Sequence, residues 1–95
     1  MIIRIVQMHF RADAIDEFKA LFDEVSPVIR TFPGCRHLEL WQDQDEPGRI
    51  FTYSHWDAPN DLEHYRGSDF FKETWTRTKV LFHSRANAWT VQQIA

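Results

Sequence analysis

The sequence predicts an α+β fold in which helices cover one face of a four-stranded antiparallel sheet. Three observations support this prediction. Segments with apolar residues at alternate positions, typical of strands, occur near both ends of the chain and as a pair in its middle. Segments with apolar residues at steps of three and four, typical of helices, lie between them. Proline, glycine and polar turns separate these segments, which gives the order β-α-β-β-α-β.

Four segments are predicted to form strands. Ile2–Phe10 carries bulky apolar side chains on both of its alternating faces, which indicates that both faces are covered. Cys35–Gln42 and Arg49–Trp56 are joined by residues 43–48, a polar, turn-rich segment that predicts an antiparallel hairpin. The last strand is expected at residues 87–94.

The first helix is predicted between Asp13, a plausible N-cap, and the Pro33-Gly34 pair that ends it. Pro27 is expected to kink or tighten the final turns, because proline lacks a backbone N–H. The apolar stripe of this helix consists of Ile15, Phe18, Leu21, Phe22, Val25 and Ile29.

The second helical region has two parts. Pro59 is favourable at the start of a short helix over residues 60–66, and Gly67 ends that helix. Ser68 is then a good N-cap for a longer helix. The inner stripe of the longer helix is predicted to contain Phe71, Trp75, Thr78 and Phe82.

Aromatic residues are numerous, with eight Phe, four Trp and two Tyr among 95 residues. Such side chains bury about 150–250 Å² each, and a domain this small has difficulty hiding all of them. The strands are bulky on both faces, whereas the helices cover only one. A second copy packed sheet to sheet is the simplest cover, so we expect a two-fold homodimer. Trp41, Trp56 and Trp89 are expected to pack under the helices or in the dimer seam.

Composition argues against several functional classes. A formal net charge of −3 is atypical of nucleic-acid-binding proteins, which usually show a basic stripe. No apolar run approaches the roughly 20 residues of a membrane span, and the first residues lack the features of a signal peptide. The single cysteine, Cys35, fits a reducing compartment, so a cytoplasmic location is expected. The chain has no Gly-rich phosphate loop, nucleophile elbow or CxxC pair.

Four short motifs occur in a set order: Phe32-Pro33-Gly34-Cys35, His55-Trp56-Asp57, Leu62-Glu63-His64-Tyr65 and Ser68-Asp69-Phe70-Phe71-Lys72. In this order, and over nearly the whole chain, they resemble the antibiotic biosynthesis monooxygenase-like (ABM) domains. The resemblance implies a single ABM-like domain over residues 1–95. It also implies the ferredoxin-like split β-α-β sheet, with helices on one face, and assembly into a dimeric α/β barrel.

The ABM family includes several activities. Some members use oxygen to oxidise aromatic polyketides or quinols without a metal, flavin or haem. Others bind and degrade haem, and many have no established reaction. The resemblance implies a cofactor-independent monooxygenase that oxidises a small aromatic or quinone-like molecule in a hydrophobic pocket between sheet and helices. The alternative is a non-catalytic dimer of the same fold, with a ligand-binding or structural role.

Haem degradation is the least favoured activity. The haem-degrading relatives bind iron through a His on the last helix, where this chain carries Trp75, and loss of that His removes the axial ligand. Those relatives also use an Asn on the first strand and a Trp on the short helix. The corresponding positions here hold Val6 or Gln7, and Tyr65.

Tyr65 and Trp75 stand at the family's pocket positions and are the predicted substrate-binding aromatics, since planar rings stack on aromatic side chains. For Trp75, simple core filling is an equal alternative. Gln7, Thr52 and Ser54 are polar residues on strand faces that are otherwise apolar. Gln7 and Ser54 are therefore candidates for hydrogen bonds to substrate; bonds to each other or to water are the alternative.

His9, His55 and His64 are the candidate catalytic bases. A cofactor-free oxidation needs a base that deprotonates the substrate, and a histidine with a pKa near 7 is suited to this. His9 and His55 lie in mid-strand, where they could face the barrel interior, and His64 lies beside Tyr65. A surface or structural role is the alternative for each. The histidines show no metal-ligand spacing, so no metal site is predicted.

Arg4 is a charged residue on an otherwise apolar strand. Three partners are open to it: Glu39, Asp57 or an acidic ligand. The sequence does not decide among them.

Overall fold

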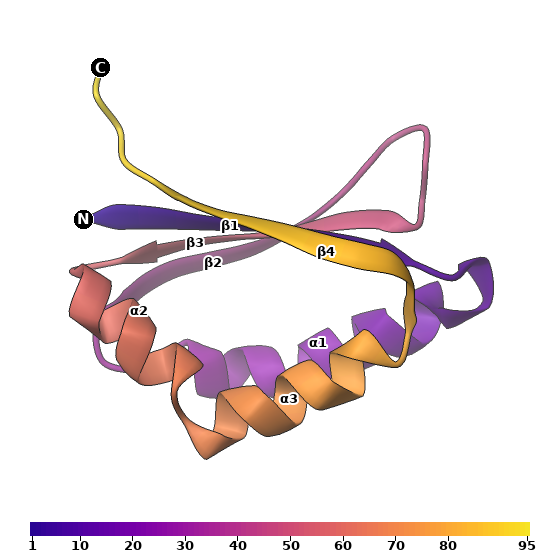
Figure 1. Cartoon of the computed structure of the whole chain (residues 1–95), viewed down its shortest axis with the longest axis horizontal. Coiled ribbons are helices and arrows are strands. Elements are labelled where there is room, and N and C mark those ends of the chain that lie inside the picture. The colour runs from indigo at the N-terminus through magenta and orange to yellow at the C-terminus, as the bar shows by residue number, and fades with distance from the viewer.

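The computed structural model describes all 95 residues. Its elements follow the predicted order and form the expected ferredoxin-like α+β fold (Figure 1). The strands are β1 (Ile2–Phe10), β2 (Cys35–Gln42), β3 (Arg49–Trp56) and β4 (Phe82–Val91). The helices are α1 (Ile15–Ile29), α2 (Pro59–Arg66) and α3 (Asp69–Lys79), with a 3-10 turn at Ala12–Ala14. No helix combines the length and the apolar composition that a membrane span requires.

The strands form one antiparallel sheet in the order β2-β3-β1-β4. The helices lie together on one face of this sheet, and no helix lies on the opposite face (Figure 1). Alternation along each central strand therefore divides its side chains between the helices and the open face. The β1–β3 register brings three helix-facing pairs together: Arg4 with Ser54, Val6 with Thr52, and Met8 with Ile50.

The main core lies between α1 and the sheet. The predicted apolar stripe of α1 is confirmed, because Phe18, Leu21, Val25 and Ile29 are buried. They belong to one apolar cluster with Met8 and Ile50 of the two central strands. Each fully buried side chain of this size stabilises the fold by about 1.5–3 kcal/mol, so this cluster is the main source of stability.

The predicted N-cap of the first helix is wrong. Asp13 lies within the 3-10 turn, where its carboxylate accepts a hydrogen bond from Arg11 Nε at 3.2 Å. Helix α1 begins at Ile15 without a side-chain cap. Because Asp13 lies in this turn and accepts from Arg11, it is not placed to cap α1.

Pro27 lies inside α1, and its predicted effect on the final turns stays a prediction. The helix continues through Pro27 to Ile29, and the chain then closes with two hydrogen bonds that span three residues instead of four. They run from Thr31 N to Val28 O at 3.0 Å and from Phe32 N to Ile29 O at 3.1 Å. Such short bonds are common where a helix ends.

Ser68 caps α3, as predicted. Its hydroxyl accepts a hydrogen bond from Phe71 N at 3.0 Å and donates one to Tyr65 O at 2.6 Å. One side chain therefore closes the end of α2 and opens α3. The bend that results brings the rings of Tyr65 and Phe71 to within 5.1 Å of each other, measured between centroids.

The predicted bounds of the last strand are wrong. β4 spans Phe82–Val91, instead of residues 87–94. Phe82 pairs with Phe10 across the sheet, and their rings meet edge to face at a centroid distance of 5.3 Å. Phe82 therefore does not belong to the stripe of α3, which ends at Lys79. Its spacing of seven residues from Trp75 is helical, but pairing with β1 determines its conformation.

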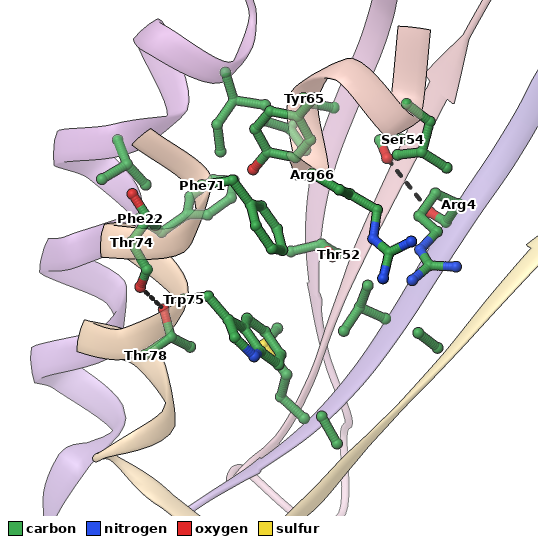
Figure 2. A pocket seen from close by; sticks show the side chains of 18 of the residues that line it. Arg4, Phe22, Thr52, Ser54, Tyr65, Arg66, Phe71, Thr74, Trp75 and Thr78 are labelled. Carbon is green, nitrogen blue, oxygen red and sulfur yellow. Dashed lines mark hydrogen bonds between the residues drawn. The ribbon is translucent and has the colours of Figure 1, made fainter. Parts of the chain in front are cut away.

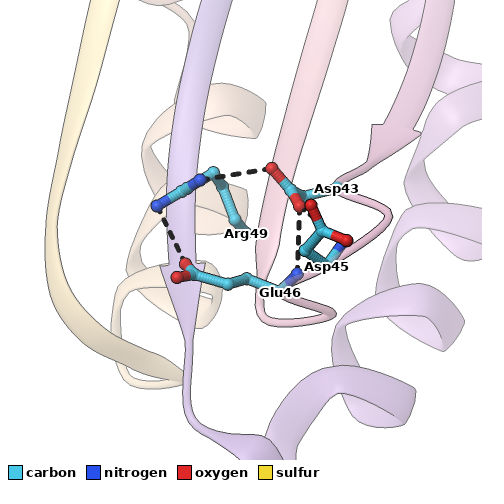
Figure 3. Close-up of polar contacts among 4 residues, drawn as sticks. All are labelled: Asp43, Asp45, Glu46 and Arg49. Atoms are coloured by element: carbon cyan, nitrogen blue, oxygen red, sulfur yellow. Dashed lines mark hydrogen bonds and ion pairs between the residues drawn. The ribbon is translucent and has the colours of Figure 1, made fainter.

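A polar turn joins β2 to β3 (Figure 3). Asp43 Oδ1 accepts the backbone N–H groups of Asp45 at 2.8 Å and Glu46 at 3.0 Å. These backbone hydrogen bonds, with a smaller contribution from Arg49, hold the pKa of the Asp43 carboxyl below its ordinary value. Arg49 also pairs with Glu46 at 2.8 Å. The turn fixes the hairpin register, which decides the side chains of β3 that face the helices.

The open face of the sheet is rich in aromatic residues. Trp41 and Trp89 are 41% and 48% exposed. Trp41 stacks on Tyr53 with ring centroids 4.5 Å apart, and the Tyr53 hydroxyl lies 2.7 Å from His55 Nε2. Of the three tryptophans considered in the sequence, Trp56 alone lies beneath the helices.

Gly34 links the end of the first helical segment to β2 in a conformation that other residues rarely adopt. Its φ is 83°, and a Cβ atom added there would lie 2.4 Å from Asp61 Cγ. Its carbonyl oxygen accepts a hydrogen bond from Asp57 N at 2.9 Å, which ties this connection to the end of β3.

We expect Gly34→Ala to lower the free energy of unfolding by about 1–3 kcal/mol, because the substitution combines a left-handed backbone with a steric clash. Urea unfolding followed by circular dichroism measures the change. Gly67→Ala is the control, since Gly67 has an ordinary helical conformation. Equal losses of stability in the two variants would contradict this explanation.

Candidate functional site

A cavity of about 410 Å³ lies between the helices and the sheet (Figure 2). Fifteen of the 22 residues that line it are hydrophobic. Its size lies within the range of about 300–1,000 Å³ that is usual for small-molecule sites. The cavity is therefore large enough for a ligand of one to three fused rings.

The sheet forms the floor of this cavity. β1 and β3 contribute neighbouring residues because their register places helix-facing side chains opposite one another. The floor consists of Arg4, Val6, Met8, Leu38, Thr52, Ser54, Trp56, Ala86, Asn87 and Ala88. Small side chains on β4, such as Ala86 and Ala88, leave room above that strand.

The helices form the walls and roof, and their aromatic residues are in contact. Tyr65 of α2 meets Phe71 of α3 edge to face at a centroid distance of 5.1 Å. Phe71 lies parallel to Trp75, one turn later, with ring centroids 6.0 Å apart. Figure 2 shows the three rings along one side of the cavity. A planar aromatic ligand could stack against this surface.

Trp56 anchors this aromatic wall to the sheet. Its side chain is 1% exposed and stacks on Tyr65 with ring centroids 5.1 Å apart. Its indole N–H donates to Ser54 Oγ at 3.0 Å, which satisfies the one polar atom of the ring. Tyr65 is therefore held in place by packing on both sides.

The Tyr65 hydroxyl is oriented toward the cavity (Figure 2). Burial raises the pKa of Tyr65 well above its ordinary value, because the phenolate would lose hydration there. At neutral pH this side chain is a neutral phenol. It can donate a hydrogen bond to a ligand, and it is a poor general base.

Two arginines give one part of the cavity a positive charge. Arg4 extends from β1 and Arg66 from the last turn of α2, and their guanidinium groups lie close together (Figure 2). Burial, together with the charge of Arg66, lowers the pKa of Arg4 from its usual value. Arg4 pairs with neither of the carboxylates considered in the sequence, since Asp57 binds Arg36 and Glu39 binds His37 and Trp41.

The structure brings together three of the predicted site residues. Tyr65, Trp75 and Ser54 all line the cavity. The Ser54 hydroxyl already has two hydrogen-bond partners within the protein, because it accepts from Trp56 Nε1 and donates to the Arg4 carbonyl oxygen at 3.5 Å. The neighbouring Thr52 also lines the cavity and is a further polar contact for a ligand.

The other four predicted site residues lie outside the lining. Gln7, His9 and His55 alternate with the helix-facing residues and so belong to the open face of the sheet. His64 is exposed on α2, with its ring 6.3 Å from that of Phe32. Their proposed roles in catalysis and binding remain predictions.

Sequence reasoning missed Arg66 and Thr74 as lining residues. Arg66 follows the buried Leu62 by four positions, a spacing that places both side chains on one face of α2. That spacing could have identified Arg66. Thr74 precedes Trp75 on α3 and carries no comparable signal.

No group of three or more His, Cys, Asp or Glu side chains is arranged to hold a metal ion. The lining also contains neither histidine nor cysteine, the commonest protein ligands of haem iron. These residues do not fit a haem site of that kind.

The family model described as antibiotic biosynthesis monooxygenase matches residues 1–77. The chain belongs to this ABM family. No match was found among curated proteins.

Several solved structures share the ABM fold of this chain. A crystal structure described as an antibiotic biosynthesis monooxygenase has a TM-score of 0.92 at 20% identity and covers 100% of both chains. A protein from Mycobacterium tuberculosis has a TM-score of 0.89 at 20% identity, with 99% of this chain and 95% of that chain covered. A conserved protein from Methanosarcina mazei Go1 has a TM-score of 0.91 at 18% identity, with 99% of this chain and 94% of that chain covered. At these identities the likeness establishes the fold and not the reaction.

We expect Tyr65 to ionise well above pH 10, the ordinary value for tyrosine being about 10. Burial of the neutral Tyr65 phenol therefore contributes to the stability of the folded protein. Because the folded-state pKa is raised, this contribution is complete below the unfolded-state pKa and is lost as pH rises through the folded-state pKa. A pH titration of the ultraviolet absorbance of phenolate measures this. Tyr65→Phe should remove the late-titrating signal and Tyr53→Phe should retain it. Loss of that signal in Tyr53→Phe alone would refute the assignment.

Proposed function

We propose that this ABM protein is a cofactor-independent monooxygenase that oxidises a small aromatic or quinone-like molecule in the cavity between sheet and helices. The observation that carries the proposal is the apolar cavity of about 410 Å³ with Tyr65, Phe71 and Trp75 along one wall. An aromatic wall favours a planar substrate by stacking, and the apolar lining excludes water from reactive intermediates.

The proposed reaction needs no external reductant. In one balanced form, an activated ring methylene becomes a carbonyl: R₂CH₂ + O₂ → R₂C=O + H₂O. One oxygen atom enters the product, the other leaves as water, and the substrate supplies all the electrons. The first step removes a proton from the substrate, because the delocalised anion is the species that reduces oxygen.

The charges of the lining support an anionic form of the substrate. Arg4 and Arg66 would stabilise negative charge that develops on a ring oxygen, in the manner of an oxyanion site. Tyr65 would add a hydrogen bond from its neutral hydroxyl. His9, His55 and His64 remain the proposed proton acceptors. His9 and His55 lie across the sheet from the cavity and His64 is exposed on α2, so water molecules would carry the proton from the substrate to them.

A non-catalytic ligand-binding role is the second candidate. It is favoured by the ionisable groups of the lining, which are two arginines and a tyrosine with a raised pKa. None of these is a good proton acceptor at neutral pH. The cavity would then hold a metabolite without converting it, and oxygen consumption separates the two candidates.

The proposal includes a homodimer that joins the open faces of two sheets. Two supporting observations are the exposure of Trp41 and Trp89 and the apolar residues of β1 beside them. Large exposed aromatic patches usually mark interaction sites. In such a dimer, His9 and His55 would lie inside the barrel.

We expect anthrone to bind and to be consumed with oxygen, with one O₂ taken up for each ketone formed. Trp75→Ala should weaken binding by about 3- to 10-fold, because an aromatic contact is lost. Isothermal titration calorimetry and an oxygen electrode measure the two effects. Thr76→Ala, an exposed change on the same helix, is the control. Binding without oxygen uptake favours the non-catalytic role, and no binding of any planar aromatic contradicts both roles.

We expect the protein to sediment as a dimer, at twice the 11.4 kDa of one chain. Trp89→Glu should shift the equilibrium toward monomer, since it places a charge within the proposed interface. Val80→Glu is the matched control, because Val80 is exposed at the end of α3 on the helical side. A monomeric parent protein at micromolar concentration would argue against the interface.

A further inference from the structure

The cavity contains a charged feature that its apolar walls do not explain. Arg4 lies on β1 opposite Ser54 of β3 and Thr90 of β4. Its NH1 group donates to Thr90 Oγ1 at 2.9 Å, which is its one side-chain hydrogen bond within the protein, and no carboxylate lies within ion-pair distance of it. The guanidinium group therefore has donors free to bind a ligand.

A second guanidinium group faces the same space. Arg66 NH1 pairs with Glu63 at 3.0 Å on the exposed side of α2, and the rest of its guanidinium lies beside Arg4 (Figure 2). Two cations at close range repel each other, and partial burial of Arg4 strengthens the repulsion. An anion placed between them would relieve it.

The acidic residues that could neutralise Arg4 are committed elsewhere. Arg36 Nε–H is shared between the two carboxylate oxygens of Asp57, and Arg36 NH2 donates to Asp57 Oδ2 at 2.6 Å. Glu39 lies on the open face of the sheet with His37 and Trp41. Arg4, Arg66 and Glu63 together carry two positive charges and one negative charge, so the group has a net charge of +1. One monoanionic ligand group would balance it.

We propose that the ligand of this cavity carries a carboxylate on an aromatic ring system, with the carboxylate on Arg4 and Arg66 and the rings against Tyr65, Phe71 and Trp75. The planar fork of a guanidinium group matches a carboxylate through two parallel hydrogen bonds. This inference rests on the proposed binding function and specifies the substrate class. A carboxylate is favoured over a phosphate because one negative charge balances the group and because most of the lining is apolar.

Binding of matched ligands by calorimetry at pH 7 tests the proposal. 2-Naphthoate and 2-naphthamide have nearly the same shape and differ in charge. We expect naphthoate to bind about 10- to 100-fold more tightly, as is usual for a charge-assisted hydrogen bond replaced by a neutral one. Arg4→Gln should reduce that preference to about twofold or less, and Arg66→Gln should reduce it by about 3- to 10-fold. Added salt should weaken naphthoate binding only.

Two further variants make the test specific. Arg36→Gln removes an exposed arginine that does not line the cavity, and it should leave the preference unchanged. Arg4→Lys keeps the charge without the planar fork and should retain an intermediate preference. Thermal unfolding identifies any variant that fails to fold. If Arg4→Gln does not fold, the binding preference of Arg4→Lys tests the role of Arg4 in its place.

The outcomes separate this inference from the proposed function. If naphthoate and naphthamide bind equally well to the parent protein, the carboxylate assignment is wrong and the aromatic cavity stands. If neither binds, the proposed function fails as well. If 2-naphthyl phosphate binds more tightly than naphthoate, the anion site is real but its ligand belongs to the phosphate class, which overturns the assignment.

Discussion

The position of the cavity depends on the packing of Trp56 against Tyr65. Trp56 ends β3, lies opposite Ile2 and Cys35 in the neighbouring strands, and is almost fully buried. Stacking on Tyr65 holds α2 against this end of the sheet, and Ser68 then turns the chain into α3. Loss of this contact would loosen the aromatic wall, because Tyr65 packs on both Trp56 of the sheet and Phe71 of α3. The stacked rings of Trp56 and Tyr65 thus set the separation between α2 and the sheet.

The cavity combines two kinds of recognition at its two ends. Toward α3, Phe71 and Trp75 provide an apolar surface that favours planar rings. Toward β1, Arg4 and Arg66 provide two positive charges, and the protein balances one of them through the pairing of Arg66 with Glu63. This polarity would orient an aromatic anion in one direction, and such fixed orientation is what selective oxidation of one ring position requires.

Much of the fold could be predicted because local signals agreed with tertiary structure. The bounds of β1, β2 and β3 follow from alternation between strong turn signals, and Ser68 is a cap by residue type and position. The start of β4 was missed because Phe82 continues the helical spacing of α3, and only pairing with Phe10 decides its state. The site was partly predictable. Tyr65 and Trp75 follow from the family motifs, whereas the side of the sheet that Arg4 faces depends on long-range register.

A crystal structure of the protein grown with 2-naphthoate would show directly where an aromatic carboxylate binds. We expect naphthyl density along the wall of Tyr65, Phe71 and Trp75, with the carboxylate within hydrogen-bond distance of Arg4. A ligand bound on the open sheet face, or one whose carboxylate is turned away from both arginines, would contradict it. A cavity closed by rotation of Trp75, with no ligand inside, would remove the physical basis for the proposed substrate class.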